Sequence, residues 1–195
     1  GHTMDDQAET VLLNLVRGAG LDGLSGLGRH DPRRPLLRIR RSETEALCES
    51  EGLEPVRDPS NDDPRFRRNR IRREVIPLLS DVAGRDVVPV LARQADLLAD
   101  EASLLDELAA ELDPADARRL RRAPLPLARR ALRRWLRTPD QGGDAEEHPP
   151  SAAEVARVMA VAQGLVTSCE LAGGRRVSRS AGRLSVHPGT RPEGR

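Results

Sequence analysis

The sequence contains no lysine, and all of its 32 basic residues are arginine. Against 31 acidic residues this leaves a net charge of +1, so the chain lacks the large charge excess that keeps a protein unfolded. Guanidinium groups grip phosphate in a bidentate way, which makes nucleic-acid contact one explanation of the arginine bias. A GC-rich genome produces the same bias, and the two causes can act together.

Cysteines are few, and long apolar runs are absent. Cys48 and Cys169 lie far apart, without companions at the spacing of a zinc site or a redox pair, which argues against a metal or disulfide framework. No stretch approaches the ~20 apolar residues that span a bilayer, and the first residues do not follow the pattern of a secretory leader. We therefore expect a cytoplasmic protein without membrane contact.

The first half of the chain alternates helix signals with turn signals. Residues 3–17 begin with a Thr-x-x-Asp capping pattern and continue with apolar residues at helical spacing. A glycine-rich loop over 18–28 follows, and the apolar run at 35–39 is compatible with one parallel strand. Ser42 is expected to cap a helix that runs to residue 51. A strand followed by a helix is typical of an α/β sheet.

The second half predicts helices and a terminal hairpin. Leucines recur every seven residues across a long amphipathic helix, and a second helix is dense in arginine. A Gly-Gly pair between two short polar strands is a hairpin signal. The expected elements are helices over 86–112, 120–136 and 151–163, a linker over 140–150, strands flanking 173–174 and a last strand over 183–187.

These signals together predict the fold class. We expect an α/β half-domain with an incomplete parallel sheet over 1–80, followed by a mainly helical domain over 81–139. After the linker, residues 151–195 should form a helix, a small β-hairpin and a tail. Helix should predominate.

Two clusters of residues have the composition of a functional site. The first places His2, Asp5, Asp6 and Glu9 at a helix start, where carboxylates can hold Mg²⁺ and free amides can face a nucleotide phosphate. Acidic residues in a first helical turn are also ordinary capping groups. From the residues alone, both interpretations stay open.

The second cluster combines a turn with a basic helix. Asp58 and Asn61 precede the arginine-rich segment 65–73. An acid beside guanidinium groups can bind an ammonium group while the arginines bind phosphates. The alternative is a simple Asx-turn next to a solvated basic helix.

Four sequence blocks occur together in one order and spacing: GHTMDDQAETVLLNLVRGAGLDGLSGL from residue 1, RPLL from 34, RDPSN from 57 and RNRIRREVIPLL from 68. In this the chain resembles the tRNA(Ile)-lysidine synthetases, members of the N-type ATP pyrophosphatase group. Residues 1–80 are similar to the C-terminal half of the pyrophosphatase domain. The later helices and the closing GGRRVSRSAGRL resemble the helical, tRNA-binding domain of that family.

The resemblance implies a ligase that uses ATP and Mg²⁺ to adenylate C2 of the wobble cytidine in a tRNA(Ile) with a CAU anticodon. The ε-amino group of free lysine then displaces AMP, and lysidine remains. By this likeness, Asp58 is the residue expected to hold the lysine ammonium group. The implied roles are catalysis for Asp5, Asp6 and Arg17; ATP binding for Gly1, His2 and Asp5; Mg²⁺ binding for Asp5 and Asp6; lysine and nucleotide binding for Asp58, Asn61, Asn69 and Arg70; and tRNA binding for Arg67, Arg68, Arg73, Arg129 and Arg133.

One departure from the family pattern stands out. The Ser-Gly-Gly-x-Asp-Ser loop with which the family binds the ATP phosphates does not occur in the sequence. We therefore expect a C-terminal portion that is inactive alone, needs an N-terminal partner segment, and is a candidate for homodimer formation. A non-catalytic RNA-binding module derived from the family is the alternative function. A tRNA thiolase is disfavoured, because it would be expected to show paired catalytic cysteines.

Overall fold

The computed structural model describes residues 1–28, 31–56, 58–138 and 150–188. The chain divides into two compact units, Gly1–Ala102 and Ser103–Arg195, which are treated separately below. The division lies inside one long helix, whereas the sequence suggested a boundary near residue 80. The predicted linker, apart from Pro150, and the histidines at 30 and 148 lie outside the described residues.

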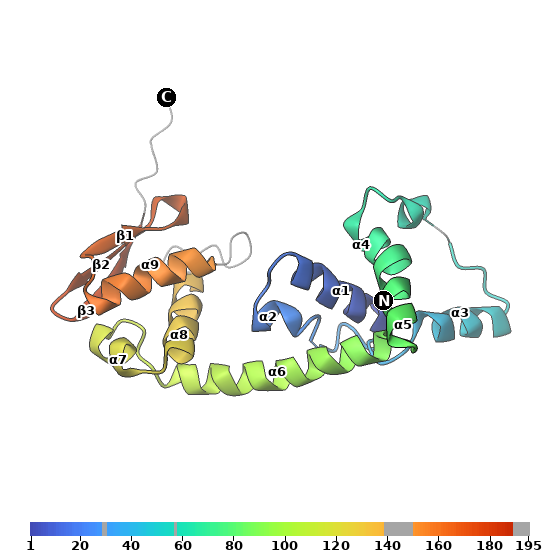
Figure 1. The fold of residues 1–195 in the computed structure, drawn as a ribbon, viewed down its shortest axis with the longest axis horizontal. Coiled ribbons are helices and arrows are strands. Elements are labelled where there is room, and N and C mark those ends of the chain that lie inside the picture. Colours follow the sequence, from blue (N-terminus) through green and yellow to red (C-terminus); the bar gives the residue numbers. More distant parts are fainter. Residues whose placement is uncertain (29–30, 57, 139–149, 189–195) are drawn as a thin grey trace, which may run out of the picture. The chain divides into compact units, whose positions relative to one another are not determined.

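Unit 1 is built from helices around a small core (Figure 1). Its elements are α1 (Met4–Val16), α2 (Leu21–Leu24), α3 (Arg41–Ser50), the 3₁₀ turn η1 (Pro59–Asp62), α4 (Arg67–Arg70), the π-helical η2 (Ile71–Val75), α5 (Ile76–Ala83) and the first part of α6 (Val88–Ala110). α1 buries Ala8, Val11 and Leu12, and Ile71 from η2 belongs to the same buried set. α1 contacts α2, α4 and η2, so the first helix is the centre of this unit.

The predicted parallel strand at 35–39 is not formed. These residues make turns, and no β-strand occurs among the described residues of unit 1. A strand needs a neighbour to pair its backbone groups, and here the carbonyl of Ile39 instead accepts a hydrogen bond from the amide of Met4 at 2.9 Å. Leu37 is the buried side chain of this segment, which anchors the turn.

In unit 1, the predicted helix cap is formed at α1 but not at α3. At α1, the amide and hydroxyl of Thr3 donate to Asp6 Oδ2 at 2.8 and 2.9 Å, as the capping pattern predicts. The prediction of a Ser42 cap was wrong, because α3 begins at Arg41. Asp5 Oδ2 accepts the Arg41 amide at 2.7 Å. A carboxylate from another helix thus satisfies the first turn of α3, and no serine cap is needed.

Unit 2 contains the end of α6 together with α7 (Ala117–Arg122), α8 (Leu125–Arg137) and α9 (Ala152–Gln163). The single helix predicted over 120–136 was wrong, because the chain breaks at Ala123 and Pro124. Ala123 is extended, with φ −71° and ψ 151°, which is the conformation that a following proline favours. α9 starts at the predicted Ser151, whose hydroxyl accepts the Glu154 amide at 3.1 Å.

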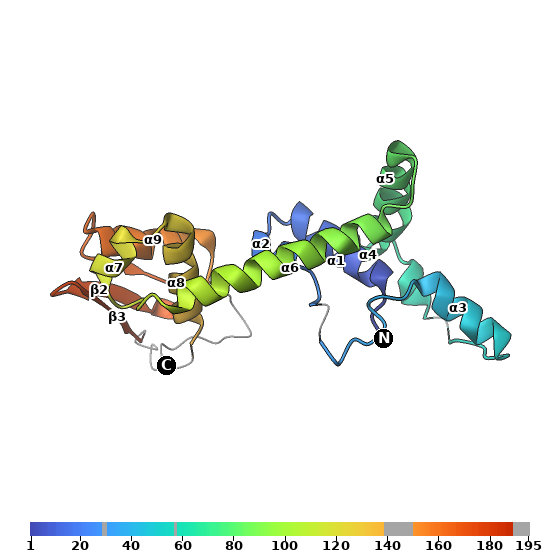
Figure 2. The same ribbon diagram turned by 90° about the horizontal axis from the view of Figure 1, so that it is seen from below.

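The terminal strands form a three-stranded antiparallel sheet, which confirms the predicted small sheet at this end of the chain. The strands are β1 (Ser168–Glu170), β2 (Arg176–Ser180) and β3 (Arg183–His187), with a 3₁₀ turn η4 (Ala172–Gly174) between the first two. α9 packs on all three strands (Figure 2). The core of unit 2 includes Leu120, Leu132, Leu136, Val158, Val161, Val177 and Leu184. Among the described residues of the whole chain, no helix is both long and apolar enough to cross a membrane.

Candidate functional site

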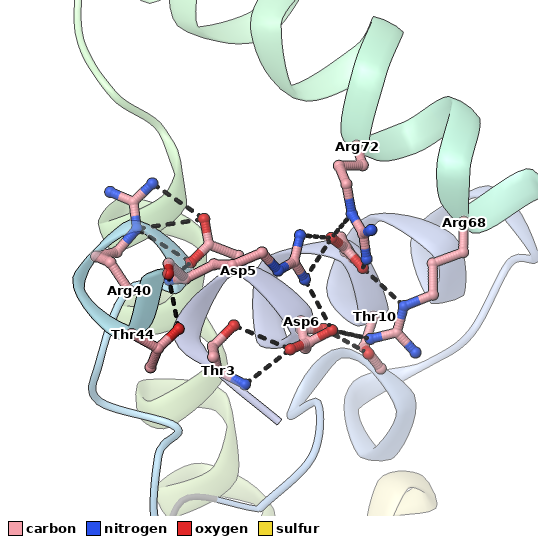
Figure 3. A network of polar contacts seen from close by, with 10 residues as sticks. Thr3, Asp5, Asp6, Thr10, Arg40, Thr44, Arg68 and Arg72 are labelled. Atoms are coloured by element: carbon pink, nitrogen blue, oxygen red, sulfur yellow. Dashed lines mark hydrogen bonds and ion pairs between the residues drawn. The ribbon is translucent and has the colours of Figure 1, made fainter. Parts of the chain in front are cut away.

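A fully buried carboxylate lies at the centre of unit 1. The side chain of Glu9 on α1 is 0% exposed, and it forms ion pairs with the guanidinium groups of Arg41, Arg68 and Arg72. Figure 3 labels Arg68 and Arg72 in this network. Arg72 Nε donates to Glu9 Oε1 at 2.6 Å, and Arg68 Nε donates to Oε2 at 2.7 Å. Arg41 adds longer contacts of 3.3 Å to Oε1. A buried charge needs such partners, because it has lost its water. One acid therefore joins α1, α3, α4 and η2.

Asp6, about one helical turn before Glu9 on α1, belongs to the same network. Its Oδ1 accepts hydrogen bonds from Arg41 at 3.1 Å and Arg68 at 3.0 Å, while its Oδ2 accepts the hydrogen bond from the Thr3 amide that caps α1. Burial alone would raise the pKa of Asp6, but the hydrogen bonds from Thr3 and the nearby arginine charges outweigh it, so the pKa lies below the ordinary 3.8. Asp6 is therefore ionised at neutral pH.

Asp5 faces a different arginine on the other side of the helix start (Figure 3). Arg40 reaches its carboxylate at 3.1 to 3.3 Å and also pairs with Asp86. Burial again acts to raise the pKa of Asp5, and the hydrogen bonds from Arg40 and the Arg41 amide bring it below 3.8. Both acids that the sequence singled out are thus ion-paired to arginines.

A cavity of about 1230 Å³ opens beside this network. Its wall includes Gly1, Asp6 from the first cluster and Asp58 and Asn61 from the second, and Arg41 and Arg72 also line it. The two clusters are some fifty residues apart in the sequence, and the fold brings them to one hollow. This volume is above the ~300–1,000 Å³ of typical ligand sites.

The residues predicted to bind lysine differ in how they are placed. Asp58 is exposed and accepts the Ser60 amide on Oδ1 at 2.8 Å, an Asx-turn whose hydrogen bond lowers the pKa of Asp58. Asn69 is buried, and its Nδ2 donates to the carbonyls of Ser60 at 2.9 Å and Asp63 at 2.8 Å. Asn69 therefore fixes the turn that carries Asp58. Arg70 is exposed and pairs with Glu74, and neither residue is among those that line the cavity.

The other residues predicted for ATP binding and catalysis, Gly1, His2 and Arg17, are exposed. His2 lies in solvent just before α1, and Arg17 caps the far end of that helix, about three turns from Asp5. Gly1 lines the cavity, and its close neighbour is Leu36, whose side chain would lie 3.4 Å from an added Cβ. The roles predicted for these residues in ATP binding and catalysis stay predictions.

The arginines predicted to contact tRNA do not form one group. Arg68 is committed to Asp6 and Glu9, so its guanidinium already has two acidic partners. Arg67, Arg73 and Arg129 are exposed, and Arg133 is half-buried. The predicted tRNA contacts are therefore untested, and for Arg68 they compete with an internal ion pair.

The carboxylates of Asp5 and Asp6 are not arranged to bind a Mg²⁺ ion in this structure. Within the described residues, no group of three or more His, Cys, Asp or Glu side chains is arranged to hold a metal. The oxygens of Asp5 and Asp6 accept hydrogen bonds from arginine, threonine and a backbone amide, where a hard cation would need them free. We therefore derive no step through a metal ion.

Sequence reasoning missed the central role of Glu9 and its arginines. The acid was noted only as one member of the first cluster, and Arg72 only as part of a basic segment. A signal was present, because Arg68 and Arg72 are four residues apart and so share one helix face, as do Asp6 and Glu9, three apart. Complementary charges on two helix faces are the pattern that the fold uses.

Comparison with known proteins places these residues in a family context. Residues 1–79, which contain the whole network except Asp86, match the PP-loop domain family. The chain is 48% identical over 145 residues to a tRNA(Ile)-lysidine synthase of Nocardia farcinica, covering 70% of this chain and 46% of that protein. It is 46% identical over 144 residues to the tRNA(Ile)-lysidine synthase of Mycobacterium leprae, covering 69% and 45%. The chain thus spans slightly less than half the length of these curated relatives, and the resemblance read from its sequence blocks is confirmed.

Proposed function

We propose, from the confirmed resemblance to tRNA(Ile)-lysidine synthases, that this chain is a segment of an ATP-dependent ligase. The reaction joins free lysine to C2 of the wobble cytidine in a CAU-anticodon tRNA(Ile), through an adenylated intermediate. The observation that carries the proposal is the cavity that brings Asp6, Asp58 and Asn61 together within the PP-loop region. We further propose that the ATP phosphates are bound by a phosphate-binding loop from outside these 195 residues.

The chemistry of the wall supports two subsites. Arg41 and Arg72 line the cavity, and guanidinium groups stabilise phosphate oxygens and developing negative charge during adenylation. Asp58 lies on the same wall and carries a negative charge at neutral pH. A carboxylate on the cavity wall attracts the ammonium group of lysine and repels a competing anion.

The reaction needs the lysine amine as a nucleophile, so one proton must leave it before attack on C2. In the proposed arrangement, an ionised carboxylate at the wall holds the ammonium form during binding, and the proton passes to solvent or to a carboxylate as the carbon–nitrogen bond forms. AMP is the leaving group. The carboxylates of Asp6 and Asp58 are the two on this wall that come from the predicted clusters.

The test is lysine incorporation into a CAU-anticodon tRNA(Ile) transcript with ATP, with the chain supplied together with a segment of a relative that carries the phosphate-binding loop. Asp58→Asn should raise the KM for lysine roughly tenfold to a hundredfold, since a hydrogen bond to a charged group contributes about 1.5–3 kcal/mol. The KM for ATP should stay nearly unchanged.

Asp63→Asn is the matched control. Asp63 makes the same kind of turn, with its Oδ1 accepting the Arg65 amide at 2.9 Å, but it does not line the cavity. The Asp63→Asn substitution should leave the KM for lysine unchanged. An equal effect of both substitutions would refute the role of Asp58. Retained tRNA binding without any lysine incorporation or AMP release would overturn the proposed reaction in favour of an RNA-binding module.

A further inference from the structure

The helix α3 forms one wall of the large cavity and is held at its start. Arg41, Cys48 and other residues of α3 line that cavity, yet α3 buries none of its residues. Within the described part of the chain, the hydrogen bonds that join α3 to other elements come from its first residue and the two before it. The position of this wall therefore depends on polar contacts at residues 39–41.

Arg40, the residue just before α3, bridges two acids from other parts of unit 1. Its Nη2 donates to Asp5 Oδ1 on α1 at 3.1 Å (Figure 3), and its Nη1 donates to Asp86 Oδ2. The side chains of Arg40 and Asp5 are 27% and 17% exposed, whereas that of Asp86 is 47% exposed. The contact with Asp5 is therefore the better shielded of the two.

Asp86 is itself fixed at the start of α6. Its Oδ1 accepts the Val88 amide at 2.9 Å, as a helix cap does. The two residues that follow it, Val87 and Val88, are 9% and 2% exposed, and the Val87 amide donates to the hydroxyl of Ser80 at 3.3 Å. An anchored carboxylate therefore meets Arg40 from the α6 side.

We propose that Arg40 is a positioning residue for the α3 wall, and that its bridge from Asp5 to Asp86 links this wall to the start of α6. Neither Arg40 nor Asp86 lines the large cavity, so both act through residues that do. The first of these is Arg41, whose amide donates to Asp5 at 2.7 Å and whose side chain lies on the wall. The inference rests on the proposed function only for the role of Arg41 in adenylation.

The thiol of Cys48 reports on the position of this wall, because Cys48 lies on α3, is half-buried and lines the cavity. The experiment measures the rate at which a maleimide alkylates Cys48 in the full chain. Arg40→Gln should raise this rate about tenfold, since hydrogen bonds to charged partners are lost. Asp86→Asn should raise it about threefold, because a half-exposed pair contributes less and asparagine still caps α6. In the double variant, Asp86→Asn should add nothing, because its partner is already gone.

Three controls separate the bridge from a general loosening of unit 1. Arg38→Gln removes one positive charge from an exposed side chain that does not line the cavity, and it should leave the Cys48 rate unchanged. Arg40→Lys keeps the charge but lacks the planar fork that reaches two carboxylates, so Cys48 should react nearly as fast as in Arg40→Gln. The thiol of Cys169, in unit 2, and the exchange of the α1 amides should keep their parent rates in every variant.

An unchanged Cys48 rate in Arg40→Gln, a parent rate in Arg40→Lys, or equal acceleration at Cys169 or in α1 would overturn the proposal. So would independent, multiplying effects of Arg40→Gln and Asp86→Asn. The alkylation assay needs neither ATP nor tRNA, so it gives its answer even if the proposed reaction fails. Where lysine is incorporated, Arg40→Gln should lower kcat about tenfold through misplacement of Arg41. The KM for lysine should stay nearly unchanged, because Asp58 lies in a turn of its own, and a change in this KM alone would also overturn the proposal.

Discussion

Replacing Glu9 by glutamine tests whether one buried acid holds unit 1 together. The substitution keeps the shape of the side chain and removes its charge. Three guanidiniums would then surround a neutral amide, and two of them make their shortest hydrogen bonds, 2.6 and 2.7 Å, to the lost carboxylate. The cost is large because the remaining charges lose their partner while still partly buried.

The size of the effect follows from burial. Removing one partner of a buried ion pair costs about 3–5 kcal/mol. The arginine side chains keep between 28% and 37% of their exposure, so water can solvate them in part, and we take the lower end. A loss of about 3 kcal/mol corresponds to a roughly hundredfold increase in the opening equilibrium.

Hydrogen exchange measured by mass spectrometry is the assay, because the chain has two units and a single unfolding free energy would not be well defined. Amides of α1 and of η2 should exchange roughly a hundredfold faster in Glu9→Gln at neutral pH. Amides of α9, in unit 2, should not change and serve as an internal control.

The matched variant is Glu74→Gln. Glu74 also pairs with an arginine, Arg70, but both side chains are more than half exposed, at 52% and 60%. Exposed pairs of this kind contribute little, so exchange should stay at the parent rate. A Glu9→Gln protein with less than threefold faster exchange in α1, or with the same change in α9, would refute the reasoning.

Two further predictions concern acid pH and the turn that carries the second cluster. The pKa of Asp6 in the folded state lies below 3.8. Its contribution to stability is therefore complete at pH values above the unfolded-state pKa, and it is lost as the pH falls through the folded-state pKa. Thermal melts followed by circular dichroism should show that unit 1 weakens below about pH 4, and Asp6→Asn should flatten that pH dependence. Asn69→Ala removes two buried hydrogen bonds to backbone carbonyls and should cost about 2 kcal/mol, seen as faster proteolytic cleavage of the turn, whereas unchanged cleavage would mean that the turn holds itself.

Features that depend on neighbouring residues were predictable from the sequence. The caps at Thr3 and Ser151 and the terminal hairpin each rest on contacts within a few residues, and the structure has all of them. The break at Pro124 also has a local signal in the sequence, the proline itself, which the predicted helix over 120–136 did not take into account. The residue before a proline avoids the helical conformation.

Features that depend on distant partners were not predictable in the same way. Arg41, Arg68 and Arg72 are 32, 59 and 63 residues from Glu9, and no local pattern sets which acid they will meet. The prediction for the start of α3 failed for the same reason, because the helix begins one residue before Ser42, at Arg41, whose amide donates to Asp5, 36 residues away. The spacing of Asp6 and Glu9 and of Arg68 and Arg72 marks two charged helix faces, but the pairing of these faces came from the tertiary fold.

The Glu9 network also determines what the cavity can do. Arg41 and Arg72 line the large cavity and, together with Glu9 itself, a smaller one of about 420 Å³. Glu9 forms an ion pair with each of these two guanidinium groups. The positions of the cationic groups on the wall of the large cavity therefore depend on Glu9, although Glu9 does not line that cavity. The ion pairs also lower the net positive charge that these arginines present to an incoming phosphate. Binding of an anion at the wall must therefore either share the arginines with Glu9 or draw them away from it, and in the second case unit 1 loses part of its own stabilisation as the ligand binds.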